Sequence, residues 1–269
     1  MTYGFIGLGN MGGAILRGML TSRRYPATSV FGYDTDPEKL ASFSNGFGIT
    51  ACDSFNDVVE HADTILFAVK PQQLPDVLTS ISRMERLDDK LFLSIAAGFP
   101  IQKILSLLGL PDASVVRAMP NLNAQVGEAI TAVCSDSPAS SDQITIAKEV
   151  FSSVGEVVLL PEKLLAAFSA VAGASPAFTF MYADALAMAG VQAGIPRDLS
   201  YKIALQSIKG SSINASLSKD HPDTLRDRVC SPGGTTIEGV TVLEENGFKG
   251  SVMDAIRAVI EKDEKLASN

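Results

Sequence analysis

The chain has 269 residues, a formal net charge of −8 at pH 7 and three cysteines. This length is enough for two domains, each with a core of its own. Acidic and basic residues are spread along the chain without a basic block, which argues against nucleic acid as a partner. The three cysteines form no Cys-x-x-Cys pair and the two histidines stand apart, so we expect reduced thiols, a cytoplasmic location and no metal site.

Two stretches have the length or position of a membrane or export signal. The N-terminus has neither a basic region nor an uninterrupted apolar run, so it does not resemble a signal peptide. The uncharged segment 164–183 is long enough to cross a membrane, but polar residues dilute it, and Gly173 with Pro176 would break or kink a helix there. We therefore expect helices buried inside the protein or at a subunit interface, and no membrane partner.

The first motif is a glycine-rich turn near the N-terminus. A short apolar run over residues 3–7 is followed by a turn and then by apolar residues at helical spacing. A strand, a Gly-x-Gly-x-x-Gly turn and a helix in this order are typical of dinucleotide-binding proteins. The first glycine permits the turn, the second lets a pyrophosphate approach the backbone, and the third lets the helix pack closely. The predicted cofactor-binding residues of this turn are Gly7, Leu8, Gly9, Asn10, Met11 and Gly12.

An acidic residue follows the second predicted strand, residues 29–33. Asp34 lies 22 residues beyond Gly12, close to where an acid meets the adenosine ribose hydroxyls of NAD. Because an acid there repels a 2′-phosphate, the sequence favours NADH over NADPH, although a plain turn residue remains the alternative. Asp36 followed by Pro37 predicts the start of a helix.

The strand and helix pattern then repeats. Further strands are expected at 64–69, 91–95, 114–118, 129–133 and 156–160, with helices between Pro100 and Gly109 and at 141–153. This alternation predicts an α/β fold, a doubly wound parallel sheet of the Rossmann type over residues 1–160. Ligands of such sheets lie beyond the carboxyl ends of the strands, so we expect those ends to line one crevice. The strand ends carry Gly7, Asp34, Lys70, Ala96, Ala97, Gly98, Pro120 and Asn121.

Two of these strand-end residues have alternative interpretations. Lys70 is either a contact to cofactor or substrate or a cation at the rim of the sheet. Asn121 either bonds a nicotinamide amide or a ring substrate, or serves only as a turn residue.

After Pro161 no further strand is expected. Helices are predicted at 162–172, 176–194, 197–217, 222–230, 235–247 and 250–266, so residues 161–269 form an all-helical domain.

A second glycine motif lies in this helical part. Ser231 before Pro232 suits a helix cap, and Thr235 with Glu238 suits a capping box, so a helix is expected to begin between residues 231 and 236. The adjoining glycines leave backbone amides bare, and such a helix start can bind a small anion such as a carboxylate. The alternative is a corner between helices that merely needs glycine.

Several motifs together resemble one family, the pyrroline-5-carboxylate reductases, which carry out the last step of proline biosynthesis. The resemblance covers nearly the whole chain, and the motif at 231–237 is its most specific part. The motifs are Gly7-Leu-Gly-Asn-Met-Gly12, Val69-Lys-Pro-Gln72, Ser94-Ile-Ala-Ala-Gly98, Arg117-Ala-Met-Pro-Asn121, Ala172-Gly-Ala-Ser-Pro-Ala177 and Ser231-Pro-Gly-Gly-Thr-Thr-Ile237.

This resemblance implies a two-domain NAD(P)H oxidoreductase whose all-α dimerisation domain interleaves with a second copy, often in larger rings. Its active site would lie where the nucleotide domain of one subunit meets the helices of its partner. The substrate, a small cyclic imine acid, would place its carboxylate on the glycine loop and its ring nitrogen near Thr236, the predicted catalytic residue. The implied carboxylate-binding residues are Ser231, Gly233, Gly234 and Thr235, and the further cofactor-binding residues are Val69, Lys70, Pro71, Ala96, Ala97, Gly98 and Asn121.

The sequence departs from the family pattern in places. Ala174 stands where Gly or Ser is usual, and Phe178 stands where Tyr is usual. Many relatives carry a small polar or basic residue near the position of Asp34 and favour NADPH, which leaves both cofactors open.

Other functions are also compatible with this fold. A related imine reductase or a beta-hydroxyacid dehydrogenase would keep the same architecture, and the latter needs a catalytic lysine, for which Lys163 is the nearest candidate. A non-catalytic nucleotide-sensing protein is a third possibility, but it would not need the second, anion-binding loop.

Overall fold

The computed structural model describes residues 1–134, 136 and 138–267. The described chain forms two compact units. The first unit comprises residues 1–173 together with the end of the last helix from Ile260, and the second comprises residues 174–259. The predicted division at residue 160 marks the change from strands to helices, whereas the compact units divide at Gly173.

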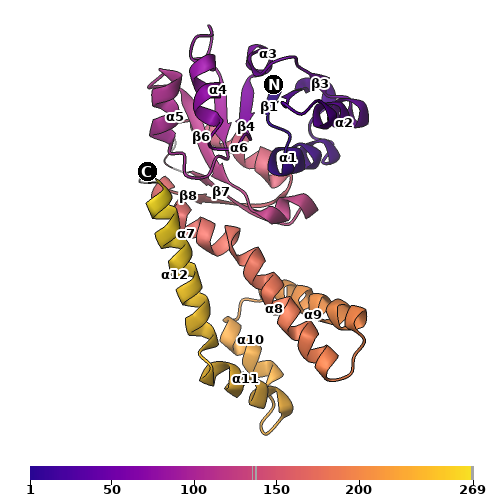
Figure 1. Cartoon of the computed structure of the whole chain (residues 1–269). Helices are drawn as coiled ribbons and strands as arrows, with labels where there is room; N and C mark the ends of the chain where they lie inside the picture. The colour runs from indigo at the N-terminus through magenta and orange to yellow at the C-terminus, as the bar shows by residue number, and fades with distance from the viewer. Residues whose placement is uncertain (135, 137, 268–269) are drawn as a thin grey trace. The chain divides into compact units, whose positions relative to one another are not determined.

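The first unit is built on an eight-stranded sheet in the order β3-β2-β1-β4-β5-β6-β7-β8 (Figure 1). All neighbouring strands from β3 to β6 run parallel. Their order, β3-β2-β1-β4-β5-β6, is the strand order of a doubly wound dinucleotide-binding sheet. The predicted Rossmann architecture is therefore confirmed. The strands are β1 (Tyr3–Ile6), β2 (Val30–Tyr33), β3 (Thr50–Ala51), β4 (Thr64–Phe67), β5 (Leu91–Ser94), β6 (Ser114–Met119), β7 (Ala129–Cys134) and β8 (Gly155–Leu160).

The sheet is mostly parallel, as predicted, but one pair of neighbouring strands is antiparallel. Strand β7 runs antiparallel to β6, with Met119 opposite Ala132, and β8 runs parallel to β7. The connection between β6 and β7 holds only a short 3-10 helix, η2 (Leu122–Val126). A parallel neighbour needs a crossover of about a dozen residues or more, which this connection cannot provide.

Helices cover both faces of the sheet. One core cluster joins α3, α4 and α5 to strand residues such as Ile65 and Phe67, and the other joins α1, α2 and α6 to residues such as Leu66. Successive residues of a strand point to opposite faces, so a continuous apolar run supplies both clusters. The elements are α1 (Asn10–Thr21), η1 (Ala27–Ser29), α2 (Pro37–Phe47), α3 (Phe55–His61), α4 (Leu74–Ile81), α5 (Ile101–Leu108) and α6 (Ser141–Ser152).

The helix starts read from local residues are largely confirmed. Asp36 caps α2, because its side chain accepts hydrogen bonds from the backbone amides of Glu38 and Lys39. Pro100 precedes α5, and Gly109 ends it in a left-handed conformation.

Beyond β8 the chain forms an irregular helical run, which ends at Gly173, where the first unit gives way to the second along the chain. It consists of η3 (Glu162–Leu164), α7 (Leu165–Phe168) and a π-helical turn, η4 (Ser169–Gly173). Together with the next helix, the run 162–192 is long and apolar enough to cross a membrane, and 22% of its most apolar window is buried. Few residues of this run are therefore fully buried within a single chain.

The second unit consists of helices, as predicted. Helices α8 and α9 pack closely, because a Cβ added to Gly190 would lie 2.2 Å from the Ser200 hydroxyl oxygen. That hydroxyl donates a 2.6 Å hydrogen bond to the Ala187 carbonyl. The elements are α8 (Ser175–Gln192), α9 (Arg197–Leu217), α10 (Pro222–Val229), α11 (Thr235–Glu245) and α12 (Phe248–Ala267).

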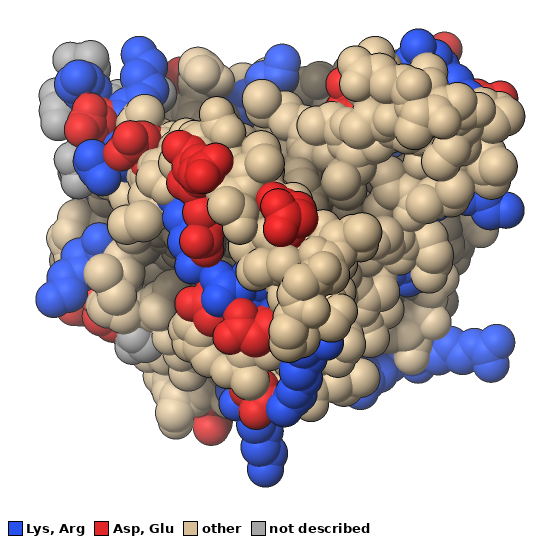
Figure 2. Space-filling view, turned by 90° about the horizontal axis from the view of Figure 1, so that it is seen from below, with Lys and Arg blue, Asp and Glu red and all other residues tan. Residues whose placement is uncertain are grey.

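Large apolar side chains are exposed along α8 and α9, and we call this set the apolar face. On the side of the molecule shown in Figure 2, uncharged residues form broad areas among interspersed acidic and basic groups. The apolar face comprises Phe180, Met181, Tyr182, Leu186, Met188, Leu199, Ile203 and Leu205.

Candidate functional site

The three glycines of the N-terminal turn have separate structural roles. Gly7 has a φ of +99°, and a Cβ there would lie 2.7 Å from the Ala68 carbonyl oxygen. A Cβ on Gly12 would lie 2.2 Å from the carbonyl oxygen of Gly7, so both positions exclude a side chain. Gly9 has no atom within 4 Å of its added Cβ, and it faces open space. The space beside Gly9 is where a ligand can approach the backbone.

Asp34 connects this turn to the end of β2. Its Oδ2 accepts a 2.6 Å hydrogen bond from the Leu8 backbone amide, and its Oδ1 accepts a 2.8 Å bond from the Asp36 amide. A third bond, from the Gly7 amide to the Tyr33 carbonyl, is 2.9 Å long. The carboxylate predicted to meet a ribose therefore also holds the two loops together.

A cavity of about 330 Å³ lies at the carboxyl ends of β1, β2 and β4. Five of the predicted cofactor residues line it, namely Gly7, Gly9, Asp34, Val69 and Lys70. Their convergence at adjacent strand ends is what the doubly wound sheet predicts. Lining residues that the sequence did not predict as cofactor contacts include Tyr33, Thr35, Asp36, Lys39, Phe55 and Gln73.

The charged groups in the cavity differ in their partners. The Lys39 ammonium lies 3.0 Å from an Asp36 carboxylate oxygen. The hydrogen bond and charge of Lys39 lower the pKa of Asp36. Lys70 is exposed and has no ion pair within the described parts of the chain. Both interpretations of Lys70, a ligand contact and a cation at the rim of the sheet, therefore stay open.

The remaining predicted cofactor residues lie outside this cavity. Leu8 is buried, while Ala97 and Gly98 are exposed just beyond β5, the strand next to β4. Ala97 and Gly98 lie along the same carboxyl edge of the sheet. The cavity is nevertheless lined by only some of the strand ends that were expected to line one crevice. The residues outside the cavity lining are Leu8, Asn10, Met11, Gly12, Pro71, Ala96, Ala97, Gly98 and Asn121.

Asn121 differs most from its predicted role. Its side chain is buried, and its Nδ2 donates a 3.0 Å hydrogen bond to the Ala172 carbonyl. Its Oδ1 accepts a 3.3 Å bond from the Ile130 amide. The amide is thus engaged with the protein backbone at both ends, rather than presented to a nicotinamide.

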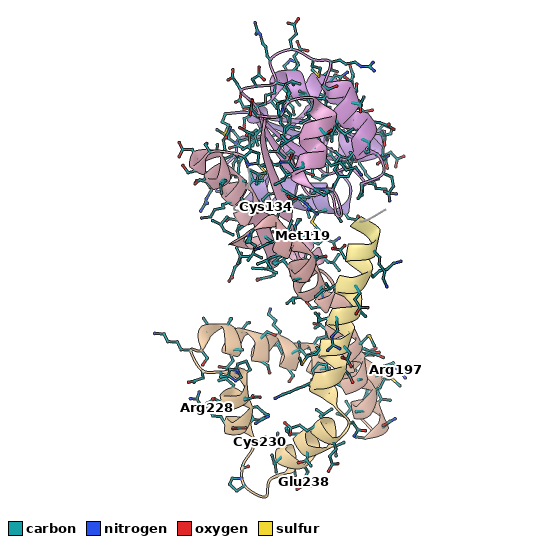
Figure 3. The ribbon with its side chains drawn as sticks, turned by 90° about the vertical axis from the view of Figure 1, so that its left-hand side faces the viewer. Met119, Cys134, Arg197, Arg228, Cys230 and Glu238 are labelled. Carbon is teal, nitrogen blue, oxygen red and sulfur yellow. The ribbon has the colours of Figure 1, made fainter. Side chains whose placement is uncertain are left out.

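The second glycine motif forms a turn between α10 and α11, with Cys230 and Glu238 labelled on either side of it in Figure 3. The Gly234 amide donates a 3.0 Å bond to the Ser231 carbonyl, and Gly233 has a φ of +66°. Proline followed by a glycine of positive φ is the pattern of a type II β-turn.

The capping predictions at this loop are wrong. Helix α11 begins at Thr235 and its N-cap is Gly234, which provides no side-chain hydrogen bond. Ser231 cannot cap it because Pro232 belongs to the preceding turn. With Thr235 already in the first helical position, Glu238 lies one residue too far along for a capping box.

The start of α11 is consequently open to a ligand. Thr235 and Thr236 are exposed, and neither side chain makes a hydrogen bond in the described part of the structure. A Cβ on Gly234 would lie 2.7 Å from the Ser231 hydroxyl oxygen, so glycine permits the close turn. First-turn amides without a side-chain cap, on a helix of 11 residues, can bind a carboxylate.

A metal centre is not supported by the described residues. They contain no group of three or more His, Cys, Asp or Glu side chains placed to hold an ion.

The chain is similar over its whole length to known proteins of one family. Residues 162–266 match the family model for pyrroline-5-carboxylate reductase dimerisation, and residues 2–98 match that for the NADP oxidoreductases described as coenzyme F420-dependent. The pyrroline-5-carboxylate reductase of Escherichia coli (strain K12) is 39% identical over 266 residues, covering 99% of this chain and 98% of the relative. That of Pisum sativum is 35% identical over 99% of this chain and 96% of the relative. The chain belongs to the pyrroline-5-carboxylate reductase family.

A solved structure of this reductase family agrees with the fold over its full length. The pyrroline carboxylate reductase of Plasmodium falciparum, solved with NADP bound, superposes with a TM-score of 0.87 at 31% identity, covering 99% of this chain and 98% of that one. Because the chain belongs to the pyrroline-5-carboxylate reductases, Lys163 is not needed as the catalytic lysine of a beta-hydroxyacid dehydrogenase. It lies exposed in η3, one residue from Glu162.

Proposed function

We propose that this reductase converts 1-pyrroline-5-carboxylate to L-proline with NAD(P)H, the last step of proline biosynthesis. The observation that carries the proposal is the open start of α11, where the amides after Gly234 adjoin the exposed hydroxyl of Thr236. The same chain carries a dinucleotide turn with an open approach at Gly9. The chain thus provides a binding site for a small carboxylate and a binding site for a hydride donor.

The chemistry asks little of the side chains. The substrate carboxylate binds at the turn formed by Ser231, Gly233, Gly234 and Thr235, and the Thr236 hydroxyl hydrogen-bonds the ring nitrogen. A bound NAD(P)H would supply a hydride to the imine carbon, and the ring nitrogen would gain one proton, which gives the secondary amine. Because a protonated cyclic imine already accepts hydride readily, holding the two carbons at about 3–3.5 Å accounts for much of the acceleration.

The first unit would bind the cofactor along the carboxyl edge of its sheet. The pyrophosphate would lie against Gly9 and the start of α1, where the helix presents backbone amides. The adenosine ribose would meet Asp34, and Val69 with Lys70 would continue the contact. Ala97 and Gly98, beyond the neighbouring strand β5, would face the nicotinamide end.

The charges of the cavity support a preference for NADH over NADPH. The Asp34 carboxylate is held in place by two backbone amides, so it cannot readily move away from a 2′-phosphate. Of the two lysines that line the cavity, Lys39 is already paired with Asp36. A 2′-phosphate beside Asp34 would therefore meet a fixed negative charge, while the positive charge of Lys39 is already offset by Asp36.

The proposed assembly is a homodimer or a larger homo-oligomer, whose active site combines one subunit's cofactor edge with the partner's glycine loop. The match to a dimerisation family model over 162–266 and the apolar face support a second copy as the occupant of this surface, rather than a lipid bilayer. The free cysteines and the dispersed charges support a cytoplasmic protein without a nucleic-acid partner.

The decisive experiment follows the absorbance of NADH and NADPH separately with pyrroline-5-carboxylate, and identifies proline as the product. Oxidation of either cofactor with formation of proline supports the activity, and a higher kcat/KM with NADH supports the preference. Turnover of a hydroxyacid but not of the imine, or cofactor binding without any imine reduction, contradicts the proposal. Light scattering of the purified protein and sedimentation with membranes after a salt wash test the assembly.

A further inference from the structure

The Ala172 carbonyl lacks the donor that a regular helix would give it. In an α-helix, the carbonyl of one residue accepts from the amide four residues later. For Ala172 that residue is Pro176, which has no N–H. The amide of the next residue, Ala177, bonds instead to the Ala174 carbonyl at 3.0 Å. The helical backbone therefore provides no hydrogen-bond donor for the Ala172 carbonyl at the junction between the π-turn and α8.

Asn121 supplies this donor from a distant part of the chain. Its Nδ2 lies 3.0 Å from the Ala172 oxygen, and the two residues are only 5% and 7% exposed. A buried carbonyl without a partner is unfavourable, so this bond has a structural consequence. Because Oδ1 accepts from the Ile130 amide at the start of β7, the side chain joins the sheet to the π-turn.

The other end of the same run is also held. One carboxylate oxygen of Glu162 accepts 2.9 Å bonds from the Arg117 guanidinium and from the Ile101 amide. The Glu162 amide donates a 2.7 Å bond to Asp136. Arg117 and Asn121 belong to one five-residue motif, and they fix residues 162 and 172 respectively. The motif thus fastens both ends of the segment 162–173 to the sheet.

We propose that Asn121, together with Arg117, is a positioning residue that holds segment 162–173 and does not contact the cofactor or the substrate. This segment carries the chain from the unit with the dinucleotide turn to the unit with the glycine loop. Hydride transfer tolerates displacements of well under about 1 Å, so a loosened connection slows the chemical step before it weakens cofactor binding. This role rests on the proposed function for its kinetic effect, whereas the hydrogen bond itself does not.

The test uses Pro176 to separate positioning from ligand contact. Asn121→Ala removes the donor, and we expect kcat to fall about 10- to 100-fold while the Kd of NADH stays within twofold. Pro176→Ala provides a backbone N–H four residues after Ala172. The double variant Asn121→Ala, Pro176→Ala should therefore recover most of the lost kcat. The matched control is Asn123→Ala, which should behave as the parent because the described structure gives the Asn123 side chain no hydrogen bond.

A second measurement does not depend on the substrate. Hydrogen exchange of the amides in 165–173 should accelerate in Asn121→Ala and return toward the parent rate in the double variant. A parent protein that fails to reduce the imine would contradict the proposed function while leaving this comparison intact. If Asn121→Ala does not fold, recovery of folding by the added Pro176→Ala supports the proposal.

Three outcomes would overturn it. An unchanged kcat in Asn121→Ala would show that the bond is not needed for positioning. A tenfold weaker NADH affinity without recovery by Pro176→Ala would make Asn121 a cofactor contact. Failure of the second change to restore either folding or exchange protection would show that Asn121 does not act through the Ala172 carbonyl.

Discussion

The backbone amide of Leu8 donates a 2.6 Å hydrogen bond to the carboxylate of Asp34. This contact joins the dinucleotide turn after β1 to the loop after β2, two segments whose relative placement defines the cavity at the sheet edge. A residue usually read only as a ribose contact is therefore also part of the support of the turn. Changes at Asp34 should affect stability and cofactor choice together.

Replacing Asp34 by Ser tests both effects. Loss of the charge should raise the ratio of kcat/KM for NADPH to that for NADH by about tenfold, since repulsion of a 2′-phosphate is removed. Loss of the hydrogen bonds to a charged acceptor should lower the free energy of unfolding by about 1.5–3 kcal/mol. Parallel kinetics with both cofactors and urea unfolding measure the two quantities.

A second variant, Asp36→Asn, separates the effect of charge on cofactor choice from the effect of hydrogen bonding on stability. Asp36→Asn keeps a good helix cap at α2 but removes the ion pair that neutralises Lys39. We expect a smaller rise in NADPH use with little loss of stability. An unchanged cofactor ratio in both variants would contradict the charge argument.

Two glycines of the dinucleotide turn should respond differently to the same substitution. Gly9→Ala meets no atom within 4 Å, so the melting temperature should change little while the Kd of NADH rises at least about tenfold. Gly12→Ala would force a Cβ to 2.2 Å from the Gly7 carbonyl oxygen, so the fold itself should be destabilised. Thermal unfolding and NADH fluorescence titration compare them. Equal effects on stability would show that Gly9 is constrained by packing rather than by a ligand.

Features fixed by neighbouring residues could be predicted from the sequence. The glycine turn, the Asp36 cap and the helix between Pro100 and Gly109 depend on residues a few positions apart, and the structure confirms them. The continuous apolar runs likewise indicated strands buried on both faces.

Features that depend on distant or competing groups could not be predicted. The two-residue strand β3 has too little pattern, and the antiparallel direction of β7 follows from the short connection after β6. At α11, the local sequence fitted a cap by Ser231 and a capping box of Thr235 with Glu238. The turn from Ser231 to Gly234 instead makes Gly234 the N-cap, so neither side chain caps the helix. The Asn121 bond joins residues 51 positions apart, so only the missing N–H of Pro176 hinted that Ala172 needed a partner.

The ion pair between Arg117 and Glu162 should contribute measurably to stability. The two side chains are only 9% and 24% exposed and lie 2.9 Å apart. Arg117→Met would leave the carboxylate without its cation, and we expect a loss of about 3 kcal/mol in the free energy of unfolding. Urea denaturation measures it. In the double variant with Glu162→Gln the loss should be smaller than the sum of the single losses, and strict additivity would argue that the pair does not interact.

The cysteines should differ in their reactivity toward thiol reagents. Burial, followed by the charge of Glu162, raises the pKa of the Cys134 thiol to about 12, and burial raises the pKa of Cys52. The thiolate is the reactive form, so at pH 8 these two thiols should react only after unfolding. Cys230 is partly exposed beside the glycine loop and should react first. Peptide mapping after alkylation of the native protein checks this order, and early labelling of Cys134 would contradict it.

The thiol shift also predicts a pH dependence of stability. The folded pKa of Cys134 lies above the value of the unfolded chain, so the folded state favours the neutral thiol. Its contribution is complete below about pH 9 and declines as the pH rises toward 12. The free energy of unfolding, measured at pH 8 and at pH 10, should decline less between these two pH values in Cys134→Ala than in the parent.

Thr236 carries the catalytic part of the proposal, and a nearby threonine offers a matched control. Thr236→Val keeps the shape of the side chain but removes the hydroxyl expected to bond the imine nitrogen. We expect kcat/KM for pyrroline-5-carboxylate to fall about 100-fold or more, with the Kd of NADH unchanged. Thr241→Val removes a hydroxyl from the same helix, where it donates only to the Ile237 carbonyl. Because that group lies about two turns beyond the loop, the control should keep its activity. Equal losses in the two variants would point to damage to α11 rather than to loss of the hydrogen bond to the substrate.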